Sequence, residues 1–166
     1  SDYPLRDVYK RQVEDSVKRV VIAGGGNIGL RLAQRIEDRY QVKVIERSRD
    51  RARMIAERLT KAIVLTGDAA DEELLLEENI DQADVFVALT NAEEVNILSA
   101  MLAKRLGCRK VMALINRPSD AELVEGPRID VGISPPQITL GNILAFVRQA
   151  EQTARELASR EGIFAG

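Results

Sequence analysis

The sequence predicts an α/β domain built on a doubly wound parallel sheet of six strands in the order 3-2-1-4-5-6, with a long C-terminal crossover helix. Three observations lead to this prediction. Short β-branched runs alternate with segments of helical period, which is typical of right-handed βαβ units. The first run, at 20–23, ends in the glycine-rich turn GGGNIG, and an acidic residue, Glu46, closes the second run. Together these features indicate a Rossmann-like sheet.

The first half of the chain predicts three strands separated by helices. β-branched runs give the strands, and apolar residues that recur every three or four positions give the helices. Ser48 and Asp71 are typical N-caps, because their side-chain oxygens can accept a hydrogen bond from a first-turn N–H group. In order, we expect a strand at 20–23, a helix ending near Arg39, a strand at 41–46, a helix from Ser48 to Leu59, a strand at 62–65 and a short helix after Asp71.

The second half continues the alternation and ends in a long helix. In order, we expect a strand at 85–89, a helix at about 93–106 that stops at Gly107, a strand at 111–115, one short helix within 116–123, a strand at 129–133 and a helix from Ser134 and Pro135 to about Arg160. The first of these helices has one apolar stripe, formed by Val95, Leu98, Leu102 and Leu106. The stripe of the last helix continues past the point where the sheet can cover it, so part of it is expected to meet another subunit. Its residues are Ile143, Phe146, Val147, Ala150, Ala154 and Leu157.

The composition is that of an ordinary globular domain. Of the 166 residues, 45% are hydrophobic and 30% are charged, and the net charge is -2. This balance offers no basic surface for nucleic acid, and no apolar run reaches the roughly 20 residues that a membrane span needs. No signal peptide opens the chain, so we expect a cytoplasmic protein that does not insert into the membrane.

The residue types that most often act as catalytic groups or metal ligands, histidine and cysteine, are almost absent from the sequence. The chain has no histidine and a single cysteine, Cys108, which we interpret as a packed thiol. An internal disulfide and a cysteine–histidine metal cluster are therefore excluded, and no metal ligand is expected. Because histidine is the commonest general base at neutral pH, its absence argues against an enzyme.

The glycine-rich turn predicts an anion site. Gly24 turns the chain tightly, Gly26 has no Cβ to hold a pyrophosphate away, and Gly29 lets the next helix pack closely. That helix brings its positive dipole end and free backbone N–H groups to the same point. Because glycine turns are common, the alternative is that these glycines only shape the turn.

Glu46 is the residue expected to bind the ribose of a nucleotide whose phosphates lie at the glycine-rich turn. It lies about 20 residues after the turn, at the end of the second strand, where a carboxylate can accept both hydroxyl hydrogens of an adenosine ribose. Because a carboxylate repels a 2′-phosphate, NAD or an adenine nucleotide is favoured over NADP, although the neighbouring Arg47 weakens this preference. The alternative is an exposed glutamate at a strand end.

Further residues are expected around the same crevice. Arg47 or Arg51 can lie over an adenine ring or beside a phosphate, or they belong to a solvated helix face. Asp68 can accept the adenine amino proton or cap the helix that follows it. Thr90 and Asn91 end the fourth strand, where small polar groups meet the far end of a dinucleotide, or they serve only the local turn.

The crevice offers no acid or base for a dehydrogenase. None of Tyr3, Tyr9 and Tyr40 has a lysine four residues later, and no second, substrate-binding domain is present in the sequence. A nucleotide sensor is therefore the leading hypothesis. The alternatives are a fragment of an NAD-dependent oxidoreductase and a structural dimerisation domain with a vestigial site.

These observations divide the chain into three parts. Residues 1–16 show no helical or strand period, and we interpret them as an N-terminal tail or an expression remnant. Residues 17–134 form the Rossmann-like nucleotide-binding domain. Residues 135–166 form the crossover or dimerisation helix and a tail.

The sequence resembles the TrkA-type regulators of K⁺ conductance, a family also called RCK, KTN or TrkA-N domains. The resemblance covers about 17–150 and is strongest to the second of the two such domains in the bacterial potassium uptake members of the family. The matching segments are GGGNIG at 24–29, VIER at 44–47, GDAADEELL at 67–75, ADVFVALTNAEEVNILSAMLAKRLG at 83–107 and IDVGISPPQIT at 129–139.

The resemblance implies a cytosolic, non-catalytic subunit of a Trk-type potassium uptake system that binds NAD(H), or ATP, ADP or AMP, and gates a membrane transporter subunit. It also implies a homodimer or higher assembly through the C-terminal helix, peripheral to the inner face of the cell membrane. Asn27, where ATP-binding relatives often carry arginine, and Leu114, near which many members carry one, favour NAD(H) over a tightly held triphosphate. The residues that the resemblance assigns to the ligand are Gly24, Gly26, Asn27, Ile28, Gly29, Glu46, Arg47, Gly67, Asp68, Ala69, Thr90 and Asn91.

Overall fold

The computed structural model describes residues 19–115, 131–133 and 140–160, and in the last helix it describes side chains through Gln152 and again at Glu156. The expected tail at 1–16, the short helix within 116–123 and the helix start at Ser134 and Pro135 lie outside the described residues. Within them, no helix is long and apolar enough to cross a membrane.

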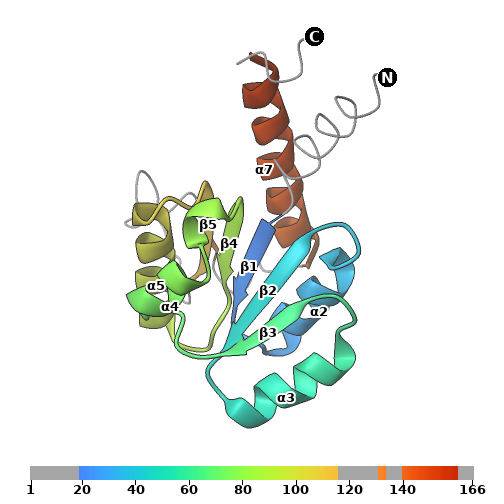
Figure 1. Cartoon of the computed structure of the whole chain (residues 1–166), viewed down its shortest axis with the longest axis vertical. Helices are drawn as coiled ribbons and strands as arrows, with labels where there is room; N and C mark the ends of the chain where they lie inside the picture. Colours follow the sequence, from blue (N-terminus) through green and yellow to red (C-terminus); the bar gives the residue numbers. More distant parts are fainter. Residues whose placement is uncertain (1–18, 116–130, 134–139, 161–166) are drawn as a thin grey trace, which may run out of the picture.

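Six described strands form one parallel sheet in the order β3-β2-β1-β4-β5-β6, which confirms the predicted order (Figure 1). β1 pairs with β2 on one side and with β4 on the other, so that Ala23 lies beside both Ile45 and Ala88. The carboxyl ends of these three strands therefore meet at one edge, where the strand order reverses. The strands are β1 (Arg19–Ala23), β2 (Gln41–Glu46), β3 (Ile63–Thr66), β4 (Val85–Ala88), β5 (Lys110–Leu114) and β6 (Val131–Ile133).

Helices cover both faces of the sheet, and the two predicted N-terminal caps, Ser48 and Asp71, are confirmed. The Ser48 side chain accepts a hydrogen bond from the Arg51 N–H, and the Asp71 side chain accepts one from the Glu73 N–H. Gly107 follows the fifth helix with a φ of +112°, as expected of a C-terminal glycine. The helices are α2 (Asn27–Ile36), α3 (Arg49–Arg58), α4 (Glu72–Glu77), the 3₁₀ helix η1 (Ile80–Gln82), α5 (Glu93–Arg105) and α7 (Leu140–Arg160).

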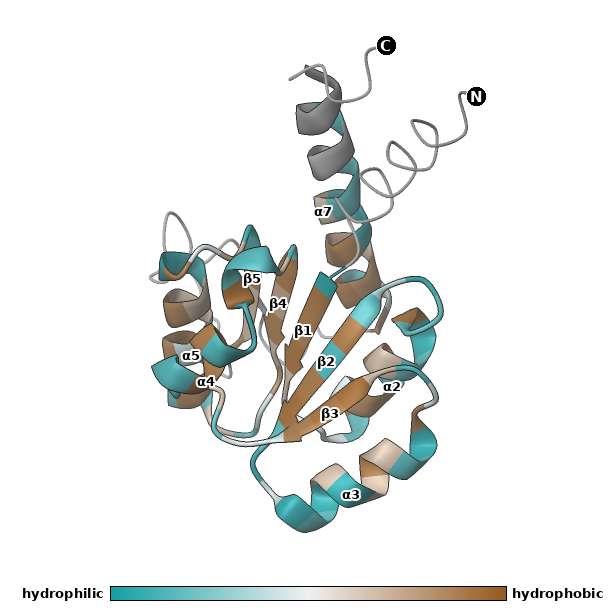
Figure 2. Ribbon diagram, viewed as in Figure 1, coloured by the Kyte–Doolittle hydropathy of each residue, from teal (hydrophilic) through white to brown (hydrophobic). Residues whose placement is uncertain are grey.

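Two hydrophobic cores lie on the two faces of the sheet. Val20 and Ile22 of β1 point into the core beneath α2, α3 and α7, whereas Val21 and Ala23 point into the core beneath α4 and α5. Figure 2 shows the central strands as the most apolar part of the fold, because both of their faces are covered. Cys108 is buried in the second core, which confirms the prediction of a packed thiol.

The apolar stripe of α5 is only partly buried, since Leu102 and Leu106 pack against the second core but are not fully covered. Leu98 is 56% exposed, and the residues of this helix that are buried against the sheet are Asn96, Ser99, Ala100 and Ala103. Small side chains let the helix approach β4 and β5 closely, so proximity rather than side-chain size decides which face is covered. The predicted stripe is therefore wrong at Leu98, whereas Leu102 and Leu106 pack against the edge of the core.

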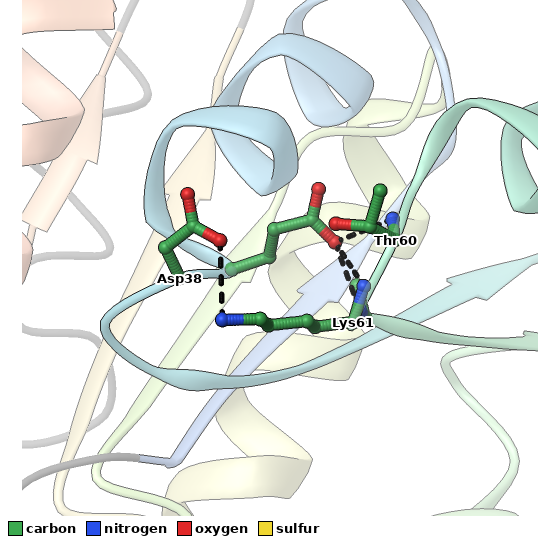
Figure 3. A network of polar contacts seen from close by, with 5 residues as sticks. Asp38, Thr60 and Lys61 are labelled. Atoms are coloured by element: carbon green, nitrogen blue, oxygen red, sulfur yellow. Dashed lines mark hydrogen bonds and ion pairs between the residues drawn. The ribbon is translucent and has the colours of Figure 1, made fainter.

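Helix α2 ends at Ile36, three residues before the predicted end, and the next residue, Glu37, has a tertiary role that the sequence did not reveal. The Glu37 carboxylate accepts hydrogen bonds from three consecutive backbone N–H groups, those of Thr60, Lys61 and Ala62, at 2.9, 2.6 and 2.9 Å. Figure 3 shows this network together with the neighbouring ion pair between Asp38 and Lys61. The carboxylate thus fixes the turn between α3 and β3 to the end of α2.

The first half of α7 packs on the domain itself, through Ile143, Phe146, Val147 and Ala150. The contact ends in a polar cluster, where the buried Glu151 accepts a hydrogen bond from the Tyr40 hydroxyl at 2.5 Å and pairs with Arg39 at 3.1 Å. Beyond it α7 extends away from the sheet (Figure 1). The side chains of Ala154 and Leu157, which complete the predicted stripe, lie outside the described residues.

The substitution Tyr40→Phe is expected to lower the free energy of unfolding by about 2 kcal/mol, because it removes a donor from a buried carboxylate. Burial and the bond to Glu151 raise the pKa of Tyr40 to about 12 from its ordinary 10.0. The hydroxyl's contribution is therefore complete below about pH 10 and is lost as the pH rises toward the folded-state value. Urea unfolding at about pH 8 and about pH 11 should show a larger loss for the wild type than for Tyr40→Phe; equal losses would contradict this.

Candidate functional site

An open cleft of about 600 Å³ lies at the carboxyl ends of the central strands. Every predicted site residue lines it except Ile28 and Gly29. The cleft also uses residues that the sequence did not single out, namely Ile45, Ser48, Leu89, Ala92 and Val95. Apart from Ser48, which the sequence marked only as a cap, these are apolar or small residues with no chemical signature.

The three glycines of the predicted motif have three different surroundings. Gly24 has a φ of +109°, and an added Cβ would lie 2.9 Å from the Leu89 carbonyl, so both its conformation and its neighbour require glycine. At Gly26 an added Cβ would meet nothing within 4 Å. The wall of the cleft is therefore open at Gly26, as a close approach of a phosphate to the backbone would need.

Gly29 and Ile28 lie behind the turn rather than on the cleft surface. A Cβ at Gly29 would lie 2.0 Å from the Gly24 carbonyl oxygen, so the absence of a side chain lets α2 start directly beneath the turn. Ile28 is half-buried and packs against the core on the side of α2. Both residues shape the turn, and neither lines the cleft.

The start of α2 is a more favourable place for an anion than the starts of α3, α4 and α5. No side chain caps it, and its first turn has no acidic residue. The first turns of α3, α4 and α5 all carry carboxylates, those of Asp50, of Glu72 with Glu73, and of Glu93 with Glu94. Since helix dipoles attract anions and carboxylates repel them, a phosphate would be placed at α2.

Glu46 is already part of a hydrogen-bonded frame. One carboxylate oxygen accepts a hydrogen bond from the Gly25 N–H at 2.9 Å, and the other accepts one from the Ser48 N–H at 2.6 Å. The side chain thereby joins the glycine-rich turn to the start of α3. Each carboxylate oxygen can accept a further bond, so two hydroxyl groups can still be bound from the cleft.

Arg51 reaches from the first turn of α3 across the glycine-rich turn. Its Nε donates a hydrogen bond to the Gly25 carbonyl at 2.6 Å, and one terminal nitrogen lies 3.4 Å from Asn27 Oδ1. Arg51 is therefore tied to the glycine-rich turn, and its predicted place over an adenine ring or beside a phosphate stays a prediction. Arg47 lines the cleft and is exposed, whereas Arg49 and Arg53 are exposed and do not line it.

The end of β3 forms the wall beside Glu46. The Gly67 N–H donates to the Glu46 backbone carbonyl at 3.0 Å, and Asp68 Oδ1 accepts a hydrogen bond from the Ala70 N–H at 2.9 Å. The Asp68 carboxylate thus stabilises its own turn, and the cap of α4 is Asp71. Asp68 remains exposed to the cleft, so its second predicted role, toward an adenine amino group, stays a prediction.

Thr90 and Asn91 form the opposite wall, beyond the end of β4. The Thr90 hydroxyl accepts a hydrogen bond from the Ala92 N–H at 3.2 Å and lies 2.6 Å from Asn96 Oδ1. Local turn chemistry is therefore present at this position. Asn96, a fully buried residue that the sequence did not single out, is the main partner of this turn.

Comparison with known proteins finds one matching family and several similar proteins. A family model described as the TrkA-N domain matches residues 20–135. The Trk system potassium uptake protein TrkA of Vibrio alginolyticus is 55% identical over 141 residues, which cover 85% of this chain and 31% of that protein. The protein of the same name from Halomonas elongata is 50% identical with the same coverage. The chain thus spans about a third of the length of these relatives.

Solved structures with the same fold have low sequence identity. The GsuK channel bound to NAD superimposes with a TM-score of 0.61 at 20% identity, covering 71% of this chain and 21% of that one. The TrkA-N domain of the inner membrane protein YbaL from Escherichia coli gives a TM-score of 0.63 at 17% identity, covering 78% and 96%. At these identities the comparison establishes the fold alone.

Proposed function

Since this chain belongs to the TrkA-N family, we propose that it is a nucleotide-sensing regulatory domain of a Trk-type potassium uptake system. The observation that carries this proposal is the cleft, in which an acid-free helix start, an open Gly26 and the framed carboxylate of Glu46 face one space. These are the features that a pyrophosphate and an adenosine ribose would use.

NAD(H) is the proposed ligand, and an adenine nucleotide is the alternative. Glu46 can accept from ribose hydroxyls and repels a 2′-phosphate, which disfavours NADP(H). The wall at Thr90 and Asn91 adds a surface beyond the turn that a mononucleotide would leave unused. The alternative has support from a structure of GsuK described as bound to ADP, which shares the fold at a TM-score of 0.62.

The ligand is proposed to be sensed and not to react. Of the four charged side chains among the described residues of the cleft, three already serve the frame: Glu46 holds two N–H groups, Arg51 holds the Gly25 carbonyl, and Asp68 holds its turn. The fourth, Arg47, is exposed. A group that moves a substrate proton has to be free to do so. A dinucleotide held here would be bound without any chemical step.

The remaining predictions on partners are part of the same proposal. The part of α7 that extends from the domain is proposed to meet a second copy, giving a homodimer or a higher assembly (Figure 1). The domain, with boundaries at 17–134 and 135–166, is proposed to act on a membrane potassium transporter from the cytoplasmic side. The name of the relatives, potassium uptake proteins, supports this partner class.

A thermal-shift panel with NADH, NAD, NADPH, ATP, ADP and AMP tests the proposal. NADH or NAD at a hundred times its Kd should stabilise the domain by about 2.7 kcal/mol, and NADPH should stabilise it less at the same concentration. Stabilisation by ADP or AMP but not by NAD(H) would select the adenine-nucleotide alternative. No stabilisation by any of the six would overturn the proposal, and steady NADH consumption with a small carbonyl compound would favour an oxidoreductase instead.

The matched variant for this panel is Gly26→Ala. Gly26 has a φ of -69° and a ψ of -172°, which alanine adopts, and its Cβ would meet no atom within 4 Å. Unfolding without ligand should therefore change by about 1 kcal/mol or less. The new methyl group stands where a pyrophosphate would approach, so nucleotide affinity should fall at least about tenfold, equivalent to 1.4 kcal/mol. Unchanged affinity would remove the turn from the binding site.

A further inference from the structure

Asn96 uses every hydrogen-bonding group of its side chain at the edge of the cleft. Its Oδ1 accepts from the Thr90 N–H at 2.9 Å and from the Thr90 hydroxyl at 2.6 Å. Its Nδ2 donates to the backbone carbonyls of Thr90 and Leu114, both at 3.0 Å. The side chain is 1% exposed, so water does not compete for these bonds.

This pattern fixes the orientation of the amide. If the oxygen and nitrogen of Asn96 exchanged places, the NH₂ group would face the Thr90 N–H and the oxygen would face two carbonyl oxygens. Thr90 lies just beyond β4 and Leu114 ends β5, so one side chain ties the ends of two neighbouring strands. The position of the Thr90 wall therefore depends on Asn96.

The same bonds also determine what Thr90 can offer a ligand. Its hydroxyl proton points to Asn96 Oδ1, with the Ala92 carbonyl at 3.2 Å as the longer alternative. One lone pair of the hydroxyl accepts from the Ala92 N–H. The remaining lone pair is the free one, so Thr90 presents an acceptor and not a donor.

The cleft has two halves on either side of β1. Glu46, Gly67 and Asp68 lie at the ends of β2 and β3, whereas Thr90 lies at the end of β4 on the other side. A mononucleotide that uses the α2 start and Glu46 occupies the first half only. The second half of a dinucleotide would continue to Thr90.

Building on the proposed function, we propose that Asn96 is a positioning residue that selects dinucleotides over mononucleotides. It holds Thr90 as an acceptor for a hydroxyl or amide donor on the second half of the ligand. Because Asn96 does not line the cleft, it acts through Thr90 and not by contact with the ligand.

The test compares the Kd values of NADH and AMP, measured by isothermal titration, in the wild type and in Asn96→Ala. NADH affinity should fall at least about tenfold, whereas AMP affinity should stay within about twofold. Thr90→Val keeps the shape of the side chain and the backbone bonds between Thr90 and Asn96, but removes the hydroxyl with its acceptor and its bonds to Asn96 Oδ1 and the Ala92 N–H. It should therefore give the same pattern even if Asn96→Ala does not fold. The matched control is Ser99→Ala, on the same buried face of α5, which should leave the ratio of the two Kd values unchanged.

Each outcome has one meaning. Equal loss of NADH and AMP affinity in Asn96→Ala, or an unchanged ratio in Thr90→Val, would overturn the positioning role and leave the proposed function intact. Equal affinities of the wild type for NADH and AMP would also overturn it, since the second half would then contribute nothing. If the wild type binds neither NADH nor AMP, this inference fails, whereas the proposed function fails only if none of the six nucleotides of the thermal-shift panel binds.

Discussion

Replacing Gly29 with alanine is expected to lower the free energy of unfolding by about 3 kcal/mol and to abolish stabilisation by nucleotides. An alanine Cβ at this position would lie 2.0 Å from the Gly24 carbonyl oxygen, far inside contact distance. Gly24 cannot retreat, because its N–H donates to the Ile45 carbonyl at 2.8 Å and its other side lies against Leu89. The start of α2 and the glycine-rich turn must therefore separate, which displaces the proposed phosphate site.

Urea unfolding and the nucleotide panel together test this prediction, with Gly26→Ala as the control. Both variants add one methyl group to the same turn, but only the one at Gly29 meets backbone. Gly29→Ala should lose stability and binding together, whereas Gly26→Ala should lose binding alone. A Gly29→Ala variant as stable as the wild type would show that the turn adapts, and would contradict the steric argument.

The second large effect is expected at Glu37. The substitution Glu37→Ala should cost about 3 kcal/mol, since hydrogen bonds to a charged group contribute more than neutral ones and three N–H groups lose their acceptor together. Burial alone would raise the pKa of Glu37, but the N–H groups of Ala62, Lys61 and Thr60 outweigh it and hold that pKa below its ordinary 4.5. A carboxyl group with a lowered folded-state pKa stabilises the protein above its unfolded-state value.

The stability from Glu37 is therefore lost as the pH falls below about 4.5 and through the lower folded-state pKa. Glu37→Gln, which cannot ionise, should show a weaker dependence of its unfolding free energy on acid pH than the wild type. Glu57→Gln changes an exposed carboxylate of α3 and serves as the control. If Glu37→Gln and Glu57→Gln show the same acid profile, the charged acceptor at the end of α2 is not the cause.

Local sequence signals were sufficient for most of the fold. The caps Ser48 and Asp71 and the glycine at Gly107 act within one or two turns of chain, so their roles could be derived from the residues themselves. The strands lie within a residue or two of their predicted bounds wherever they are described, and their order follows from the handedness of βαβ units.

The failures share one physical reason, which is that the deciding partner is distant along the chain. The role of Glu37 at the end of α2 was missed because its partner is a turn more than twenty residues away. The small residues on the buried face of α5 let the helix approach the sheet closely. A hydrophobicity pattern does not show how closely two elements approach, so it did not identify this face. Leu98, which is exposed, was consequently grouped with Leu102 and Leu106, which are partly buried against the core.

For the candidate site, the positions of the residues could be predicted from the sequence, but the bonds between their side chains could not. Gly24, Glu46 and Thr90 could be placed at one edge because parallel strands end together. The bonds of Glu46 to Gly25 and Ser48, of Arg51 to the glycine-rich turn, and of Asn96 to two strand ends depend on side-chain positions in three dimensions. Their ligand contacts stay predictions until the panel is measured.

The frame around Glu46 also has a consequence for the entropy of binding. A free glutamate or arginine loses rotamer freedom when it closes on a ligand, at about 0.5–1.5 kcal/mol for each immobilised side chain. Here Glu46 is held by two N–H groups and Arg51 by a carbonyl before anything enters the cleft. That ordering occurs during folding, so a ligand that uses these two side chains binds a surface that is already in its bound arrangement.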